Sequence, residues 1–272
     1  MIEIKKFTKR FGKRIIYNDI SLSLPKTGVV AIVGDSGSGK TTLLNAIAGL
    51  DFDYQGEIKI DSTNLKELSE NDLSDYRIHN IGYVFQNFNL LNLDSVETNI
   101  MVPFESTSNS SKKIRDRKIN ELTKMLDISK LKKEVVNKLS GGEKQRVAIA
   151  GILAMRPDLV IFDEATSMLD PKGKREISQT IKMMRKENPN LTLISITHDL
   201  EEAFNSDSII VLNQGKLLFN ASPKEILNHK EKLEQIGLDL PFRTKFVSLL
   251  KDKGISVSED DSLDGIVKKI CQ

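Results

Sequence analysis

The sequence predicts an α/β fold built around a largely parallel β-sheet. Three observations support this prediction: strand-length apolar runs recur along the chain, helical stretches separate them, and one run leads directly into a glycine-rich loop. Continuous apolar runs of this length are typical of parallel strands that are buried on both faces. Alternation of such strands with helices indicates a sheet with crossover helices.

The first part of the chain contains four expected strands and one expected helix. Ile2–Phe7 and Ile20–Leu24 alternate between apolar and polar residues, as half-buried strands do. Val29–Val33 is apolar throughout, which suits a central strand, and Thr41–Leu50 has apolar residues at helical spacing. Glu57–Ile60 is expected to be a further strand.

The middle of the chain is expected to be a helical insertion. From Leu65 to about Lys138 polar residues dominate, and amphipathic patterns such as Ile114–Leu126 outnumber strand patterns. Thr107–Ser111 is polar and is expected to be a loop. We place the helical subdomain at about residues 87–158.

Strand-like runs return after this insertion, at Leu159–Phe162, Thr192–Ile196 and Ser208–Leu212. Beyond them the sheet pattern stops, and the apolar residues near the C-terminus suggest two short helices. The expected organisation is a main domain at residues 1–236 and a short helical extension at residues 237–272.

Composition and charge argue against several kinds of protein. The 40 basic and 38 acidic residues leave a formal charge of +2, which gives no general electrostatic reason to bind nucleic acid. The single cysteine, Cys271, cannot form an internal disulfide, which favours a reducing, cytoplasmic compartment. No signal-peptide pattern follows Met1, and no apolar run approaches the roughly 20 residues that span a bilayer.

A phosphate-binding motif follows the apolar run at residues 29–33. Residues 34–41 read GDSGSGKT and match G-x-x-x-x-G-K-[ST] between a strand and a helix, which argues against an ordinary turn. Backbone N–H groups of such a loop and the N-terminus of the next helix bind phosphate oxygens. Lys40 is expected to reach the β- and γ-phosphates of a nucleotide, and Thr41 to ligate Mg²⁺.

Two adjacent carboxylates end the apolar run at residues 159–162. Ligands of open α/β sheets bind at the carboxyl ends of the strands, so Asp163 and Glu164 are expected beside the phosphate loop. Asp163 would hold Mg²⁺ directly or through water. If the extended backbone continues, Glu164 points away from Asp163 and can polarise the attacking water.

Residues 139–146 read LSGGEKQR and resemble the signature motif of ATP-binding-cassette (ABC) ATPases. Physically, this segment is a helix start with Ser140 as its cap and two glycines behind it, which makes it a second anion site. In the family, this loop meets the γ-phosphate held by the P-loop of a second subunit. The resemblance therefore implies a dimer that sandwiches ATP.

Further family markers occur in the expected order. Phe11 resembles the A-loop residue that stacks on adenine, although tyrosine is commoner there and an ordinary apolar residue is a competing interpretation. Gln86 resembles the Q-loop glutamine, which contacts Mg²⁺ and water and senses the membrane partner. Residues 167–170 resemble the D-loop, which ends at Asp170, and His198 resembles the switch histidine that contacts the γ-phosphate.

The resemblance covers about Met1–Asn220. It implies the P-loop NTPase fold of ABC ATPases: a mostly parallel sheet, an antiparallel β subdomain, a helical insertion subdomain and a short C-terminal helical extension. The residues assigned to catalysis are Lys40, Gln86, Glu164 and His198, and those assigned to Mg²⁺ are Thr41, Gln86 and Asp163. The residues assigned to nucleotide binding are Phe11, Gly34, Asp35, Ser36, Gly37, Ser38, Gly39, Lys40, Thr41, Thr42, Ser140, Gly141, Gly142 and Asp170.

Two kinds of transporter ATPase are similar to different parts of the chain. Residues 163–171 (DEATSMLDP) and the tail at residues 236–242 (IGLDLPF) resemble ATPases of energy-coupling factor (ECF) transporters, which import vitamins and metal ions. In that family the C-terminal extension helps to hold two ATPases together. Residues 86–100 (QNFNLLNLDSVETNI) resemble instead the lipoprotein-releasing and macrolide-export ATPases, which typically lack the extension. ECF import is therefore favoured, with export as the alternative.

The resemblance implies an ATP-hydrolysing subunit that is peripheral at the cytoplasmic face of the cell membrane. Its expected partners are a second ATPase, identical or paralogous, and an integral transmembrane subunit. A soluble mechanical ABC protein acting in DNA repair or translation is a competing class, but one P-loop and no sustained heptads argue against it. A non-hydrolysing regulator is opposed by the presence of Glu164 and His198.

Overall fold

A computed structural model describes residues 1–107, 111–166, 169–238, 240–258, 261 and 263–270. Most of the expected loop at residues 107–111, two residues of the D-loop segment (Ser167 and Met168) and Cys271 lie outside the described residues. Among the helices that are described, none has the length and apolarity needed to cross a membrane.

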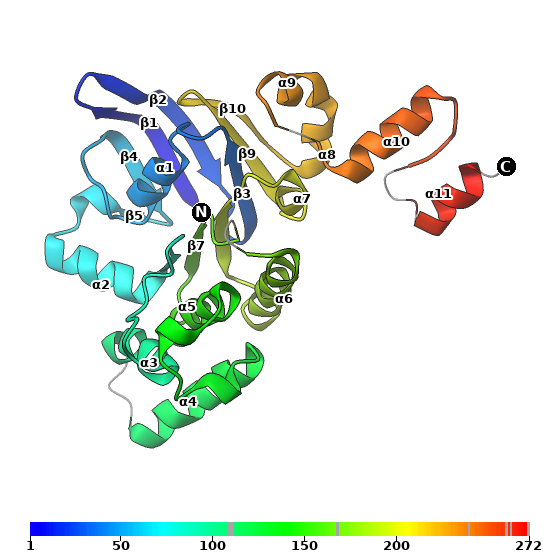
Figure 1. Cartoon of the computed structure of the whole chain (residues 1–272). Coiled ribbons are helices and arrows are strands. Elements are labelled where there is room, and N and C mark those ends of the chain that lie inside the picture. Colours follow the sequence, from blue (N-terminus) through cyan, green and yellow to red (C-terminus); the bar gives the residue numbers. More distant parts are fainter. Residues whose placement is uncertain (108–110, 167–168, 239, 259–260, 262, 271–272) are drawn as a thin grey trace.

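Strands and helices are interspersed along the chain (Figure 1). The strands are β1 (Ile2–Phe11), β2 (Arg14–Leu24), β3 (Gly28–Gly34), β4 (Gln55–Ile60), β5 (Thr63–Asn64), β6 (Ile81–Val84), β7 (Leu159–Asp163), β8 (Thr192–Ile196), β9 (Ser208–Asn213) and β10 (Lys216–Ala221). The α-helices are α1 (Lys40–Ile47), α2 (Glu70–Asn80), α3 (Val96–Thr107), α4 (Lys112–Met125), α5 (Gly141–Met155), α6 (Pro171–Glu187), α7 (Leu200–Ala203), α8 (Pro223–Ile226), α9 (Lys230–Gln235), α10 (Phe242–Asp252) and α11 (Leu263–Ile270). Short 3₁₀ helices lie at Leu65–Glu67, Ser129–Leu131, Val136–Lys138 and Leu227–His229.

The strands form two sheets. The larger has the order β10-β9-β3-β8-β7-β6, with every neighbouring pair parallel except β10 and β9. The smaller has the order β2-β1-β4-β5 and is antiparallel throughout. The expected mostly parallel sheet and antiparallel β subdomain are therefore confirmed.

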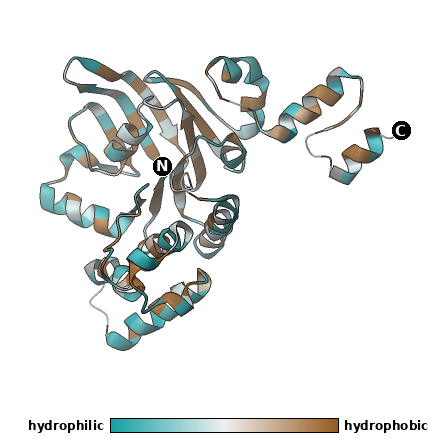
Figure 2. Ribbon diagram, in the orientation of Figure 1, coloured by the Kyte–Doolittle hydropathy of each residue, from teal (hydrophilic) through white to brown (hydrophobic). Residues whose placement is uncertain are grey.

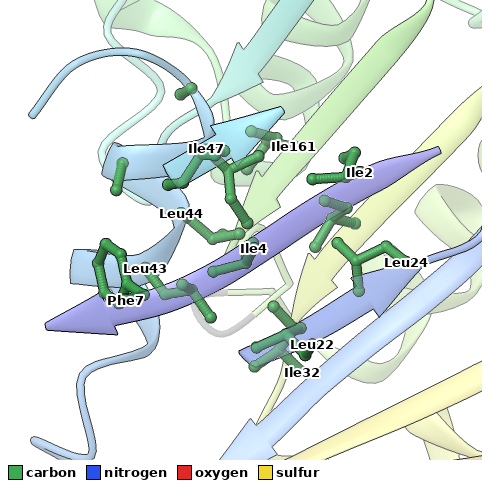
Figure 3. Close-up of a cluster of buried hydrophobic side chains, with 14 of the residues drawn as sticks. Ile2, Ile4, Phe7, Leu22, Leu24, Ile32, Leu43, Leu44, Ile47 and Ile161 are labelled. Atoms are coloured by element: carbon green, nitrogen blue, oxygen red, sulfur yellow. The ribbon is translucent and has the colours of Figure 1, made fainter. Parts of the chain in front are cut away.

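One buried cluster holds the phosphate-loop helix α1 between the two sheets (Figure 3). Ile4 and Phe7 of β1 face Leu43 and Leu44 of α1 in this cluster, and Ile161 of β7 belongs to it as well. All of these side chains are almost fully buried, and core side chains in protein interiors are closely packed. The position of α1, and of the loop that leads into it, is therefore fixed relative to β7. Figure 2 shows the hydrophobic strands beneath the more hydrophilic outer faces of the helices.

The helical insertion is built from α3, α4 and α5, which share a second buried cluster with β7 and β8. The expected helix at residues 114–126 corresponds to α4. Helices α3 and α5 approach closely, since a Cβ at Gly151 would lie 3.3 Å from Pro103. The expectation that the middle of the chain is helical overlooked strand β6, which pairs with β7 at the edge of the larger sheet.

The two expected C-terminal helices are present as α10 and α11, which project from the rest of the molecule (Figure 1). They share a small cluster of their own, which includes Val247 and Ile266. Leu238 and Leu240, in the segment before α10, are buried instead in the cluster that contains β9, α8 and α9. The extension is thus attached to the main body through this apolar segment.

Candidate functional site

The phosphate loop runs from β3 to α1 and borders a cavity of about 340 Å³. Gly39 precedes α1 with φ of 100°, and a Cβ there would lie 2.8 Å from the Tyr17 ring. Only glycine fits both the conformation and the space, which explains the glycine of the motif. The residues lining the cavity are Phe11, Arg14, Ile16, Ser36, Gly37, Gly39, Lys40, Thr41, Thr42 and Glu164.

The Lys40 side chain lies folded over the loop. Its Nζ donates to the backbone oxygens of Gly34 at 2.8 Å and Asp35 at 2.9 Å. Burial lowers the pKa of Lys40 from 10.5, and the carboxylates of Glu164, Asp35 and Asp163 oppose this shift. An ammonium has three donors, so one remains to reach an anion in the loop.

Other polar groups of the loop suit a phosphate ligand. The Ser38 hydroxyl is buried and has no hydrogen-bond partner among the described residues. A buried hydroxyl without a partner is costly, and an anion bound at this helix start would supply an acceptor. Thr42 lies in the first turn of α1 and lines the cavity.

Phe11 lies at the edge of the same cavity, beyond the phosphate loop. Its side chain is 54% exposed, and the Lys9 ammonium sits 4.8 Å from the centre of its ring. An aromatic face in this place can stack on a base whose phosphates occupy the loop. Arg14, which no sequence motif singled out, lines the cavity beside Phe11.

Asp163 and Thr41 form a pair of oxygen donors at the end of β7. The Thr41 Oγ1 donates to Asp163 Oδ1 at 3.2 Å, and Asp163 is only 8% exposed. Burial raises the pKa of Asp163, while hydrogen bonds from Tyr83 and Thr41 act in the opposite direction. A hydroxyl and a carboxylate are hard oxygen ligands of the kind that Mg²⁺ prefers, so these residues fit a magnesium ion.

Glu164 joins two distant segments at the end of β7. Its Oε1 lies 2.7 Å from Nε2 of His198, and its Oε2 accepts from Nε2 of Gln86 at 3.3 Å. The premise that the extended backbone continues through Glu164 is wrong, because β7 ends at Asp163 and Glu164 has φ of 50°. Left-handed backbone is strained for residues other than glycine and tends to occur at functional sites.

Among the described side chains, Gln86 contacts Glu164, whereas Thr41 contacts Asp163. The Glu164 carboxylate, the His198 imidazole and the Gln86 amide therefore lie together. They lie next to Thr41 and Asp163, the two residues that fit a magnesium ion. Such a group can orient a water molecule and accept its proton.

The signature loop borders a different cavity of about 440 Å³, which Leu169 and Asp170 of the D-loop segment also line. Ser140 caps α5: its Oγ accepts from the Glu143 N–H at 3.3 Å, and Glu143 Oε2 accepts from the Ser140 N–H at 2.8 Å. The hydrogen bonds from Ser140 hold the pKa of Glu143 below its usual value. The residues lining this cavity are Ser140, Gly141, Gly142, Glu143, Arg146, Leu169, Asp170, Lys172, Gly173 and Glu176.

The predicted nucleotide residues therefore fall into two groups. No residue lines both the phosphate-loop cavity and the signature-loop cavity among those described. Asp170 belongs to the second group, where its Oδ1 caps α6 by accepting from the Gly173 N–H at 2.7 Å. Among the described residues, those of the signature loop therefore do not line the phosphate-loop cavity of the same chain.

Sequence reasoning missed several polar contacts around the site. The Tyr83 hydroxyl lies 3.0 Å from Asp163 Oδ2 and 3.2 Å from Asn45 Oδ1. Glu202 Oε2 accepts from the hydroxyls of both Thr166 (2.8 Å) and Thr197 (2.9 Å) and so connects the segments after β7 and β8. Thr166 lies within the quoted segment at residues 163–171, but no role was predicted for it or for Tyr83, Asn45, Thr197 and Glu202. Tyr83 lies on β6, and a role for its hydroxyl could have been predicted from the sequence only if that strand had been recognised.

Comparison with known proteins gives a consistent family. The family model described as ABC transporter matches residues 17–167. An energy-coupling factor transporter ATP-binding protein EcfA1 of Clostridioides difficile is 41% identical over 257 residues, which are 94% of this chain and 91% of the relative. A protein of the same name from Enterococcus faecalis is 42% identical over 240 residues, covering 88% of this chain and 84% of the relative.

Solved structures give the same result. A dimeric structure of the ATP-binding cassette MJ0796 in a post-hydrolysis state, bound to ADP and Pi, is 33% identical with a TM-score of 0.75. The match covers 82% of this chain and 99% of that chain. A further dimeric structure of MJ0796, described as a bacterial ABC transporter cassette, matches equally well.

Proposed function

This chain is a member of the ABC transporter family, within the ECF transporter ATP-binding proteins, and we propose that its ATP hydrolysis drives ECF-type uptake of a vitamin or a metal ion. The ATPase activity follows from the family. The observation that carries the catalytic proposal is the position of Glu164, held between His198 and Gln86 at the end of β7.

The chain's own residues have distinct roles in the proposed reaction. The phosphate loop and Lys40 bind the β- and γ-phosphates. Thr41 and Asp163, together with Gln86, would hold Mg²⁺, which when bound neutralises charge on the phosphates. Glu164 accepts the proton of the attacking water as the water oxygen bonds to the γ-phosphorus, while the bond from that phosphorus to the β–γ bridging oxygen breaks and ADP leaves. His198 keeps the Glu164 carboxylate in place.

The signature loop is proposed to act on the ATP of a second subunit. Ser140, Gly141 and Gly142 lie at the start of α5, where backbone N–H groups and the helix dipole attract an anion. Because these residues share no cavity with the phosphate loop among those described, they can complete a site only across a dimer. Asp170, at the start of α6 beside them, would lie in the same interface.

The membrane partner is proposed to dock between the Q-loop and the helical subdomain. A cavity of about 230 Å³ lies there, lined mainly by aromatic and aliphatic residues from β6, the Q-loop, α3 and α5, together with Asn89 and Asn99. Apolar grooves of this kind receive apolar side chains of a partner. This docking would place the chain peripherally at the cytoplasmic face of the cell membrane.

Identification of the membrane partner tests this assignment. Affinity purification of the full chain from its native membranes is expected to recover an ECF-type transmembrane subunit. A permease with a large extracytoplasmic domain would contradict the import assignment and support export, the interpretation that residues 86–100 favour. The ATPase assignment would be unaffected by either result.

The adenine contact of Phe11 gives one quantitative prediction. Phe11→Ala is expected to weaken ATP binding about tenfold, since base–aromatic stacking contributes about 1–3 kcal/mol. Phe11→Tyr should bind ATP as tightly as the wild type, because it keeps the aromatic face. Fluorescence titration of a labelled ATP analogue measures the affinity.

Ile15→Ala is a matched control, because Ile15 is also an exposed apolar residue (52%) but does not line the phosphate-loop cavity. Equal ATP affinity of Phe11→Ala and the wild type would show that Phe11 is an ordinary surface residue.

The C-terminal extension, residues 237–272, is proposed to stabilise the ATPase dimer. Leu249 is 60% exposed and Val267 is 56% exposed, although both belong to helices with a buried apolar cluster. The double substitution Leu249→Asp with Val267→Asp is expected to weaken dimerisation about tenfold or more, as loss of a buried interface contact does. Sedimentation equilibrium in the presence of ATP measures this effect.

The control for this experiment is Ile114→Asp, which places one such carboxylate at another exposed apolar residue (55%), on α4. If the double variant dimerises as tightly as this control, the extension has no part in dimerisation.

A further inference from the structure

The Tyr83 side chain lies between the phosphate-loop helix and the magnesium-type carboxylate. Its hydroxyl is 3.0 Å from Asp163 Oδ2 and 3.2 Å from Asn45 Oδ1. A phenol has a single proton to donate, and an ionised carboxylate is the stronger acceptor. Tyr83 therefore donates its proton to Asp163 rather than to Asn45.

This contact completes the hydrogen bonding of the Asp163 carboxylate. Thr41 donates to Oδ1 at 3.2 Å, and Tyr83 donates to Oδ2. With each oxygen held by a different hydroxyl, the carboxylate cannot rotate about its χ2 bond without losing a hydrogen bond in a largely buried place. Outer partners of metal-binding carboxylates orient them in this way.

The ring of Tyr83 contacts Phe85, which lines the proposed docking cavity. Its ring stacks on Phe85 with centroids 4.2 Å apart and planes inclined by 24°. Tyr83 and Phe85 are both among the residues that line the 230 Å³ cavity, together with Phe88 of the Q-loop and Pro103 of α3. The Tyr83 side chain thus contacts Asp163 through its hydroxyl and Phe85, at the cavity, through its ring.

We propose that Tyr83 is a positioning residue that fixes Asp163 for Mg²⁺ and links the position of this carboxylate to the Phe85 cavity. The inference rests on the proposed function, since it assumes that Asp163 holds Mg²⁺ with bound ATP. A side chain inserted beside Phe85 would shift the stacked rings, and the Tyr83 hydroxyl would carry the shift to Asp163. The link requires no change of secondary structure, because Tyr83 and Asp163 lie on neighbouring paired strands.

The hydroxyl can be removed alone by Tyr83→Phe, which keeps the ring and its stacking. Outer partners of metal ligands typically contribute 10–100-fold to metal affinity, so Mn²⁺ should bind about 10–100-fold more weakly. The measurement is Mn²⁺ electron paramagnetic resonance on the Glu164→Gln protein, held in excess over ATP. Binding of ATP without metal, in EDTA, should not change.

Tyr54→Phe is the matched control. The Tyr54 hydroxyl is buried and has no hydrogen-bond partner among the described residues, so its loss should leave Mn²⁺ affinity at the value of the parent protein. Phe85→Ala tests the link to the cavity and should also weaken Mn²⁺ binding, although Phe85 makes no described contact with Asp163.

The outcomes separate the inference from the function on which it rests. Unchanged Mn²⁺ affinity in Tyr83→Phe, with normal binding by the parent protein, would overturn the role of Tyr83 alone. Unchanged affinity in Phe85→Ala would overturn the link to the cavity. A parent protein with no ATP-dependent Mn²⁺ binding would overturn both the inference and the proposed function.

Discussion

Glu164→Gln is expected to reduce ATP turnover about 10²–10⁴-fold, the contribution that a positioned general base makes. Glutamine has nearly the same shape as glutamate but cannot accept the proton of the attacking water. The substitution should retain hydrogen bonds to His198 and Gln86, because an amide can donate to one and accept from the other. Phosphate release under single-turnover conditions measures the loss.

ATP binding should survive this substitution to within about twofold, since a group that acts only in the transition state does not affect ground-state affinity. Bound ATP should therefore accumulate and hold the dimer closed. The exposed Glu234→Gln on α9 is the control and should hydrolyse ATP at the wild-type rate. Wild-type turnover by Glu164→Gln would show that another group accepts the proton.

The parts of the fold that could be predicted are those where one pattern dominates locally. Val29–Val33 is apolar throughout, so its position as a central strand was evident, and the structure places it inside β3. Strand β6 was not evident, because its four residues lie within a polar, helix-rich segment. Periodicity cannot identify so short a run. Strand β10 was also missed, although Gly215 is a residue that favours a hairpin turn. In the structure Gln214 and Gly215 form the turn between β9 and β10, and both have positive φ.

The candidate site shows the same division between local and long-range information. The loop motif alone predicts Lys40 and Thr41, because their chemistry depends on neighbours in sequence. The contacts of Glu164 join residues that are 34 and 78 positions apart, and only the family resemblance could suggest them. The left-handed backbone of Glu164 had no sequence signal, since such a conformation is imposed by the surroundings.

A dimer in which one protomer carries both a phosphate-loop and a signature-loop substitution is expected to occlude less ATP than a dimer in which each protomer carries one of the two substitutions. The reason is that each site would combine the Lys40 loop of one protomer with the Ser140 loop of its partner. Two tandem-linked dimers on the Glu164→Gln background test this arrangement. The first carries Lys40→Ala in one copy and Ser140→Arg in the other, and the second carries both changes in the same copy.

In the first dimer, one complete site survives, and about one ATP per dimer should be occluded, as measured by slow nucleotide release. In the second dimer, each of the two sites has lost the function of one of its loops, and no ATP should be occluded. Sites formed within single protomers would give the reverse result. Ser140→Arg also removes a helix cap, which costs about 0.5–2 kcal/mol. Ser222→Arg is the control, because it removes an equivalent cap at the capping box of α8, outside both cavities. It should leave both ATP sites intact. A loss of occlusion seen only with Ser140→Arg would therefore come from the contact of Ser140 with the ATP held by the other protomer.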